Sequence, residues 1–439
     1  MSIGGEHPDS CRQSARELAH QGRLDAAESQ YRHLLDMRPT DLEALLFVAD
    51  RHASRGQSAQ ALAILTDARR AYPAEPQLTH RIGLAQLAAD NLPVAAESLQ
   101  ETVQLAPGWF AARLYLAIAL ERMGEQQKAL VAYFTAIQQA QAQGRWLSDE
   151  TTAPALREAV KHAMRYVNSG RHQLFSQVLE PLRVRYGASA LERVEQSLAM
   201  HLGLAPMAQP DPRQQPKFFY FAGVPSQPYY PRERFPYLDA LEEATALVQR
   251  ELAQVLGNQR DLEAFLGEHS AALTQQMLSA SGDASAAWDA YFFHRHGDRY
   301  DEHCARCPGT VALLDAMPLV RIRDHAPEAL FSVLRPGTHI LPHRGVTNTR
   351  LVTHLPLVIP PDCALRVGGE THVWREGQCV TFDDTFEHEA WNRSNQTRVV
   401  LILDVWNPDL TDVERLAVTD LVEAIGDFNR QCEPPEPVA

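Results

Sequence analysis

Small and hydrophobic residues return every 34 positions over the first third of the chain. One series consists of alanines, one of prolines, one of aromatic or leucine residues, and one of glycines with Asp90 in its third place. The members are Ala27, Ala61, Ala95 and Ala129; Pro39, Pro73 and Pro107; Tyr31, Leu65, Leu99 and Tyr133; and Gly22, Gly56 and Gly124. A fixed period of this size is typical of repeat architectures.

The spacing predicts a helical hairpin in each repeat. Small residues would let the two helices approach closely, a glycine would close the first helix, and a proline would end the second. The pattern resembles about four tetratricopeptide repeats over residues 8–141. An unrelated helical bundle is the alternative, and the agreement of several positions at one period argues against it. The resemblance implies a concave face that docks a peptide or protein, or else serves as a scaffold or oligomer contact.

The composition of the chain changes after these repeats. Residues 142–205 still have a helical pattern but lack the period, which predicts a helical extension that caps the solenoid. Residues 206–236 contain eight prolines, which neither a helix nor a central strand tolerates. We therefore predict a helical repeat domain over 1–141, a helical cap over 142–205, a proline-rich linker over 206–236 and a second domain over 237–439.

The second domain begins with a helical pattern over 237–280 and changes to short β-rich runs after residue 329. Eight such runs, separated by turn residues, predict a jelly roll or double-stranded β-helix with a cupin-like barrel. A capping box from Thr411 to Glu414 predicts a last helix that covers a sheet edge or a barrel face. The predicted fold is multi-domain: an all-α solenoid followed by a double-stranded β-helix with flanking helices.

Composition and charge narrow the class of protein. Of the 439 residues, 45% are hydrophobic and 22% charged, as in a folded globular protein. No apolar run approaches the roughly 18 residues that span a bilayer, and the first residues lack a signal-peptide pattern. Together with six scattered cysteines, this predicts a cytoplasmic protein without a membrane span. Residues 201–439 carry 20 basic and 33 acidic residues, against 21 and 22 in residues 1–200, which argues against a nucleic-acid partner.

Two histidines stand in different β-rich runs, His343 in LPHRGVTNTR and His388 in FDDTFEHEAW. A barrel can build an open iron site from two imidazoles and one carboxylate, which in that pattern stands two residues after the first histidine. Here that residue is Gly345. From the residues alone three hypotheses stay open: no metal is bound, water completes the coordination, or a halide does, as in iron halogenases.

Alternation along the last strand places an arginine on an apolar face. Arg398 shares that face with aliphatic residues, and Arg350 shares a face with His354 on an earlier strand. A buried arginine is costly without an anion. The distal carboxylate of 2-oxoglutarate, held bidentately, is the natural candidate. A structural ion pair with an acid of the barrel, such as Asp404, is the alternative.

Long motifs within residues 217–430 carry a family resemblance. They include WDAYFFHRHG, FSVLRPGTHILPHRGVTNTRLVTHLPLVIP and WREGQCVTFDDTFEHEAWNRSNQTRVVLILDVWNPDL. In order and without large gaps, this part of the chain resembles the aspartyl/asparaginyl β-hydroxylase family. The resemblance implies an Fe(II)- and 2-oxoglutarate-dependent dioxygenase that uses O2. Its iron would be held by two histidines, His343 and His388, with glycine in the carboxylate position.

The resemblance also implies roles for four further residues. Ser332 and Arg398 match the pair that holds the distal carboxylate of 2-oxoglutarate, and His354 matches a contact at the other end of this cosubstrate. Arg350 matches an arginine near the carboxylate of the acceptor. Animal members of the family have a second arginine two residues later, where this chain has Val352, so contacts to the cosubstrate or the substrate must differ.

Several other reactive side chains are expected to be structural. Strand alternation would place His339 on the face of His343, with no need for both. Asp383 and Asp384 could supply the missing carboxylate, but a turn or a hydrogen bond to a metal-bound imidazole is the more common use of such residues. A structural role is expected for the lone CxxC, Cys304 and Cys307, whereas surface and turn positions are expected for the neighbouring His294, His296 and His303.

The function implied by the resemblance is hydroxylation of the β-carbon of Asp or Asn residues in a peptide or protein, with the repeat region as a docking surface. One alternative is hydroxylation of a lipid A-type acyl chain or another small carboxylated acceptor, because bacterial members of the family act on acyl chains. The others are an interaction protein with an inactive barrel, and a halogenase. Retention of the histidines together with Ser332 and Arg398 argues against inactivity, and the surrounding motifs argue against a halogenase.

Overall fold

Two compact units make up the computed structural model, which describes residues 7–257, 261–267, 271–280 and 285–433. The first unit contains the chain up to Arg171 together with the segment that starts at Phe428, and the second unit is His172–Asp427. None of the helices in the described part of the chain combines the length and hydropathy needed to cross a membrane.

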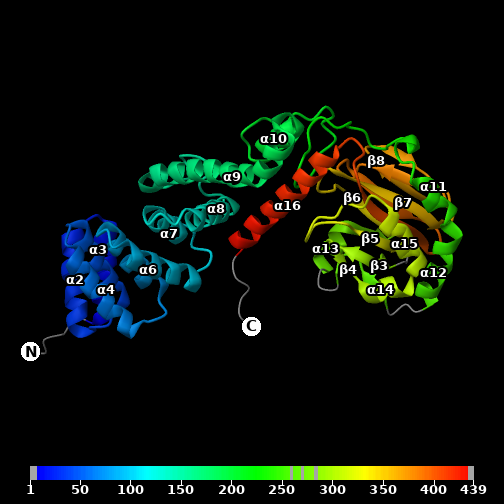
Figure 1. Cartoon of the computed structure of the whole chain (residues 1–439). Helices are drawn as coiled ribbons and strands as arrows, with labels where there is room; N and C mark the ends of the chain where they lie inside the picture. The colour runs from blue at the N-terminus through cyan, green and yellow to red at the C-terminus, as the bar shows by residue number, and fades with distance from the viewer. Residues whose placement is uncertain (1–6, 258–260, 268–270, 281–284, 434–439) are drawn as a thin grey trace, which may run out of the picture. The chain divides into compact units, whose positions relative to one another are not determined.

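The first eight helices form four consecutive hairpins (Figure 1). The first helices of the hairpins start at intervals of 34 residues, and so do the second helices. They are α1 (Pro8–His20), α2 (Leu24–Met37), α3 (Leu42–Ser54), α4 (Ser58–Ala71), α5 (Pro76–Ala88), α6 (Leu92–Leu105), α7 (Phe110–Arg122) and α8 (Gln126–Ala142). Each helix packs against the next one along the chain. The predicted array of four helical repeats is therefore confirmed.

The turn inside each hairpin follows the sequence pattern. In three repeats the residue that closes the first helix is a glycine in the left-handed region, and Asp90 takes that place in the remaining repeat with φ of 61°. Close approach of the helices explains a second small residue: a Cβ added at Gly83 would lie 2.6 Å from Cγ of Leu99. Turn geometry and helix contact thus account for two of the repeated positions.

Helices continue beyond the repeats, as predicted for residues 142–205. α9 spans Arg157–Tyr186 and α10 spans Glu192–His201. The C-terminal end of α16 (Asp412–Cys432) also belongs to the first unit, where the rings of Phe428 and Phe134 lie 5.1 Å apart.

Two antiparallel sheets form the second unit (Figure 1). The larger sheet has the order β1-β3-β5-β12-β7-β10, with β4 paired to β3, and the smaller sheet has the order β2-β6-β11-β8-β9. The strands are β1 (Glu263–Ala264), β2 (Leu278–Ala280), β3 (Trp288–Arg295), β4 (Asp298–Arg299), β5 (Ala329–Leu334), β6 (Thr338–His343), β7 (Arg350–Val358), β8 (Cys363–Val367), β9 (Glu370–His372), β10 (Val380–Phe382), β11 (His388–Asn392) and β12 (Arg398–Trp406). All eight β-rich runs predicted after residue 329 are strands.

The helical prediction for residues 237–280 is only half right. α11 (Leu238–Glu243) and α12 (Thr245–Gly257) are helices, as is the short α13 (Ala271–Met277). Strands β1 and β2 lie in the same stretch, and residues 258–260 and 268–270 lie outside the described part. Pairing of β1 with β3 and of β2 with β6 overrides the local helical pattern.

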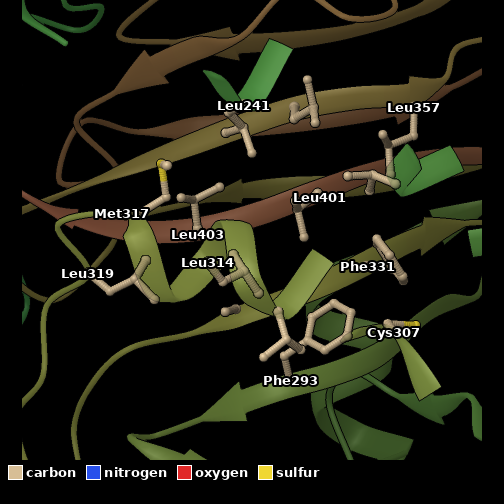
Figure 2. Close-up of a cluster of buried hydrophobic side chains, with 14 of the residues drawn as sticks. Leu241, Phe293, Cys307, Leu314, Met317, Leu319, Phe331, Leu357, Leu401 and Leu403 are labelled. Atoms are coloured by element: carbon tan, nitrogen blue, oxygen red, sulfur yellow. The ribbon is translucent and has the colours of Figure 1, made fainter. Parts of the chain in front are cut away.

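One face of the larger sheet packs against helices. Alternate residues of its central strands, such as Phe331 and Leu401, join buried residues of α11, α12, α14 (Asp301–Arg306) and α15 (Pro308–Ala316) in one hydrophobic core (Figure 2). Figure 2 shows Leu314 of α15 among the leucines of β12. These strands are buried on both faces, which explains their nearly continuous apolar sequences.

The opposite face of the larger sheet meets the smaller sheet. Val352, Phe382 and Val400 from the larger sheet share a core with Ile340 and Leu365 from the smaller one. The predicted capping box is also present: the Glu414 carboxylate accepts a hydrogen bond from the Thr411 amide at 2.8 Å, and the Thr411 hydroxyl accepts one from the Glu414 amide at 3.3 Å. The candidate site lies between the two sheets.

Candidate active site

A pocket lies between the two sheets, lined by β5, β7 and β12 of the larger sheet and by β6, β8 and β11 of the smaller. Strand alternation explains the lining, because every second residue of a strand points to the same face. The structure brings together all six residues that the sequence predicts for the site, while their roles stay predictions: Ser332, His343, Arg350, His354, His388 and Arg398.

The two candidate metal ligands face each other across paired strands. His388 lies opposite His343 in the pairing of β11 with β6, and the ring centroids are 4.1 Å apart. Nδ1 of His343 hydrogen bonds to the Leu341 carbonyl at 2.8 Å, and Nδ1 of His388 to the Phe386 carbonyl at 3.1 Å. These bonds leave Nε2 of each ring as the nitrogen for a ligand. Burial lowers the pKa of both histidines to about 4, so both imidazoles are neutral, the form that binds metals.

The side chain of Asp384 fills the space beside Gly345. A Cβ added at Gly345 would overlap the carboxyl group of Asp384. The Gly345 amide also donates a hydrogen bond to the Asp384 carbonyl at 2.6 Å, which fixes the position of one residue relative to the other. Asp384 lines the pocket, yet the described residues contain no group of three His, Cys, Asp or Glu arranged to hold a metal ion. His343 and His388 therefore stay the candidate ligands of this site.

Arg398 is buried at the opposite end of the pocket without a counter-ion. Its side chain is 1% exposed, and no carboxylate of the described residues forms an ion pair with it. Its Nη1 donates to the Ser332 hydroxyl at 3.2 Å and to the Ser332 carbonyl at 3.3 Å, while Nε has no partner in the described part. Trp288 also donates to the Ser332 hydroxyl, at 2.9 Å. The guanidinium lies 4.9 Å from the centre of the Trp374 ring.

Burial leaves Arg398 in an unfavourable environment. Burial lowers its pKa to about 10, which still leaves the group charged at neutral pH. The alternative pairing with Asp404 is not formed, because Asp404 accepts from Arg350 at 2.7 Å. A buried cation whose hydrogen-bonding capacity is unfilled is a fitting partner for a small anion.

His354 extends this anion-binding end. It lines the same pocket, is 6% exposed, and has an Nδ1 atom for which the described residues provide no partner. Burial, followed by the charge of Arg398, lowers its pKa well below the ordinary value. Together His354 and Arg398 offer polar atoms without partners among the described residues at one end of the pocket.

His339 lies outside the pocket, so the expectation that it shares the face of His343 is wrong. Its Nε2 atom lies 2.6 Å from the Glu389 carboxylate. The pairing of β11 with β6 shifts register between His388 and Ala390. This irregularity breaks the period of two, so Ile340 and His343 line the pocket in place of alternate residues.

The cysteine pair is buried, and so is His294, which is 2% exposed and therefore not at the surface as predicted; His296 is exposed, as predicted. Burial raises the pKa of Cys307 to about 12, and the Cys304 thiol donates to the Phe293 carbonyl. His303 stacks on Tyr291 with ring centroids 4.0 Å apart. None of these belongs to a metal-binding cluster within the described ranges.

Two tryptophans that contact site residues were not predicted from the sequence. Trp288 of β3 reaches Ser332 from the neighbouring strand, and Trp374 lies over the guanidinium of Arg398. The run WDAYFFHR before residue 296 is rich in aromatic residues, a signal that could have predicted β3. The contact with Trp374 had no local signal, because it depends on the packing of the two sheets.

Comparison with known proteins relates this chain to one family. Residues 242–408 match the family model described as aspartyl/asparaginyl beta-hydroxylase. The rat protein "Aspartate beta-hydroxylase domain-containing protein 2" is 31% identical over 262 residues, 59% of this chain and 73% of the relative. The human "Aspartyl/asparaginyl beta-hydroxylase" is 34% identical over 44% of this chain and 24% of its own length. The "Ornithine lipid ester-linked acyl 2-hydroxylase" of Rhizobium tropici is 30% identical over 47% of this chain and 73% of its own length.

Among solved structures, MamA is 18% identical over 46% of this chain and 97% of its own length, with a TM-score of 0.30. The TPR protein YrrB is 16% identical over 37% of this chain and 76% of its own length, with a TM-score of 0.31. The chain spans 66% of the matching frog relative and 24% of the human hydroxylase. With 31% identity over most of the rat relative, the chain belongs to the aspartyl/asparaginyl β-hydroxylase family.

Proposed function

We propose that this chain is an Fe(II)- and 2-oxoglutarate-dependent dioxygenase that hydroxylates the β-carbon of Asp or Asn residues in a peptide or protein. The observation that carries the proposal is the buried guanidinium of Arg398, which has no carboxylate partner among the described residues and lines the same pocket as His343 and His388. An anionic cosubstrate accounts for a charge that the described part of the chain leaves without a carboxylate partner.

The proposed cosubstrate site has a donor for each end of 2-oxoglutarate. Arg398 and Ser332 would bind the distal carboxylate, and His354 would contact the other end. The residues fit this group, because Nε of Arg398 and Nδ1 of His354 are buried polar atoms without partners in the described ranges. Trp288 and Trp374 would exclude water and hold Ser332 and Arg398 in place.

His343 and His388 would hold Fe(II) through two neutral imidazoles, and Gly345 would leave the third protein position without a ligand. The bound metal, 2-oxoglutarate and O2 supply an oxidation that converts a C–H bond to C–OH while 2-oxoglutarate becomes succinate and CO2. The chain itself orients the reactants: carbonyl groups fix the His343 and His388 rings, and the apolar walls keep water away.

We further propose that the two sheets form the jelly roll, or double-stranded β-helix, of residues 237–439. The antiparallel strand orders and the shared core between the sheets support this assignment. The repeats of residues 1–141 would dock the peptide or protein substrate, with 142–205 as a cap and 206–236 as a linker. We place the reaction in the cytoplasm, without a nucleic-acid partner.

Hydroxylation of an acyl chain is a second candidate. The pocket walls include Leu266, Met277, Ile340 and Ile402, which would suit an alkyl group. The Rhizobium relative is described by its name as an acyl hydroxylase. A substrate screen must therefore include both peptides and acyl lipids.

The decisive experiment supplies the purified protein with Fe(II), 2-oxoglutarate and O2, with Asp- and Asn-containing peptides in one arm and acyl lipids in the other. We expect succinate formation and a product heavier by one oxygen atom in the peptide arm. Product only in the lipid arm would replace the proposed substrate class. If wild-type protein neither binds 2-oxoglutarate nor forms succinate, the proposed function is wrong.

A further inference from the structure

Arg398 is buried among neutral groups, and one of them is an aromatic ring. Its guanidinium carbon lies over the Trp374 ring, 4.9 Å from the ring centre. Its Nη1 atom donates to the Ser332 hydroxyl at 3.2 Å, and its Nε atom has no partner in the described part of the chain. The face of an aromatic ring attracts a cation, and the attraction is stronger where water is excluded. Trp374 therefore stabilises a charge that receives no carboxylate from the described residues.

A ring and a carboxylate contact different parts of a guanidinium group. The partners of Arg350 are acids: its Nη1 atom lies 2.7 Å from the Asp404 carboxylate, and its Nη2 atom lies 3.3 Å from the Asp384 carboxylate. An acid accepts hydrogen bonds from the N–H groups at the edge of the guanidinium, whereas a ring stacks on its flat face. Trp374 thus stabilises the charge of Arg398 and leaves N–H donors for a ligand.

The loop that carries Trp374 is fixed to the strand that carries His354. It follows β9, and it is held by two hydrogen bonds: the Gly377 amide donates to the Pro356 carbonyl of β7 at 3.0 Å, and the Glu376 carboxylate accepts from the Ile359 amide at 2.9 Å. The Trp374 side chain is 2% exposed, and its ring centre lies 5.9 Å from that of His354. The ring therefore has a fixed place beside both residues that we assign to the cosubstrate.

We propose that Trp374 is a positioning residue that makes the site selective for a dicarboxylic 2-oxoacid. The ring does not line the pocket and acts through Arg398. It holds the guanidinium in one plane, so that the N–H groups are oriented before the distal carboxylate of the ligand arrives. Without the ring, Arg398 keeps its charge but loses this orientation, and a second carboxylate on the ligand gains less affinity. The inference rests on the proposed function, because it takes 2-oxoglutarate as the anion at Arg398.

The test measures the preference for a second carboxylate by anaerobic isothermal titration calorimetry of the Fe(II)-loaded protein. The two ligands are 2-oxoglutarate and 2-oxobutanoate, which has the same 2-oxoacid end but lacks the distal carboxylate. The preference is the dissociation constant of 2-oxobutanoate divided by that of 2-oxoglutarate. For Trp374→Leu we expect this ratio to fall at least about tenfold.

Trp374→Phe is the conservative variant. Nε1 of Trp374 has no hydrogen-bond partner among the described residues, so phenylalanine sacrifices none of their hydrogen bonds and keeps a ring face. Because the face of phenylalanine attracts a cation less than that of tryptophan, we expect a smaller fall of the ratio, about threefold.

Trp391→Leu is the matched control. The guanidinium of Arg393 lies over the Trp391 ring at 4.8 Å, nearly the distance found at Arg398, but Trp391 does not line the pocket. The ratio should therefore stay as in the wild type. A double-mutant cycle adds a second control: in the background of Arg398→Met, Trp374→Leu should not change the ratio, because the residue through which it acts is gone.

A purely structural role of Trp374 would weaken the binding of both ligands alike and leave the ratio unchanged. An unchanged or increased ratio in a folded Trp374→Leu would overturn the proposal. If that variant does not fold, an unchanged ratio in Trp374→Phe would overturn it. If the wild-type preference is lost in Arg398→Met but kept in the Trp374 variants, only this inference fails. If the wild-type protein does not bind 2-oxoglutarate, the proposed function fails and the inference fails with it.

Discussion

Arg398 and Arg350 lie on neighbouring strands of one sheet and line the same pocket, yet they differ in how their charges are compensated. Arg350 is neutralised by Asp404 and Asp384. Arg398 is more deeply buried and receives no carboxylate from the described residues. Burial is costly in both cases, but only at Arg350 does the chain itself compensate for it. The uncompensated charge is therefore the one that indicates a missing ligand.

The largest effect is expected at His343 and His388, because the roles proposed for Arg350 and Arg398 require a metal at this pair. His343→Ala or His388→Ala should each abolish iron retention and turnover, because a site with two protein ligands has no redundancy. His339→Ala is the control and should keep both, since His339 lies outside the pocket. Iron analysis after desalting gives the measurement. Equal loss in all three variants would show that the candidate metal site is wrong.

Replacement of each arginine by methionine tests the comparison directly. Arg350→Met leaves two buried acids unpaired and should reduce the free energy of unfolding by about 3–5 kcal/mol. Arg398→Met removes a charge that has no carboxylate partner in the described part of the chain, so stability should change little or increase. Urea denaturation of both variants measures the difference. Similar destabilisation by the two replacements would remove the distinction between the sites.

The next prediction concerns Gly345. The carboxyl group of Asp384, which pairs with Arg350, already fills the space beside this glycine. Gly345→Ala should destabilise the fold by about 1–3 kcal/mol, because the new Cβ overlaps a carboxyl group that is itself ion-paired. Gly345→Asp should in addition lower turnover, although it completes a conventional ligand set on paper. Thermal unfolding and a succinate assay measure the two effects. A gain in turnover with unchanged affinity for 2-oxoglutarate would contradict this account.

The anion-binding end makes a kinetic prediction. Arg398→Met should raise the KM for 2-oxoglutarate at least about tenfold, which corresponds to the loss of a charged hydrogen bond of roughly 1.5–3 kcal/mol. The methionine keeps the apolar stem, so the fold should survive. A 2-oxoglutarate titration and a melting curve on the same variant give the answer. An unchanged KM together with a lower Tm would make Arg398 a structural residue.

The last prediction concerns the pH dependence of stability at Asp383. Burial raises the pKa of Asp383 from 3.8 to about 7. The folded state therefore keeps a proton that the unfolded state has lost, and this contribution to stability is complete below pH 3.8 and disappears as the pH rises toward 7. The associated slope is at most about 1.4 kcal/mol per pH unit.

Asp383→Asn should remove that slope relative to wild type. Gln214 can adapt to the amide, because its Oε1 atom has no partner among the described residues and can accept from the new NH2 group. The free energy of unfolding, measured for both proteins across this pH range, tests the assignment. Parallel pH profiles would show that Asp383 is ionised throughout.

Regular elements could be predicted from the sequence, whereas pairing partners could not. The 34-residue period predicts the helix hairpins, and alternation predicts the strands from β5 to β12. Both signals come from neighbours within one element or one repeat. The helical pattern near Glu263 failed, because pairing with β3 decides the structure there. His339 was placed on the wrong face, because a register shift between two strands is invisible in either strand alone.

From the sequence alone, the repeat array, the strand-rich second unit and six of the residues that line the pocket could be predicted. The sequence also indicated that Arg398 needs an anion, since an arginine on an apolar strand face carries that requirement wherever it is buried. Tertiary contacts settle which of the two arginines has no carboxylate partner among the described residues. That choice depends on β12 bringing Asp404 next to Arg350 and on Asp384 filling the space beside Gly345, contacts between segments far apart in the chain that no local pattern encodes.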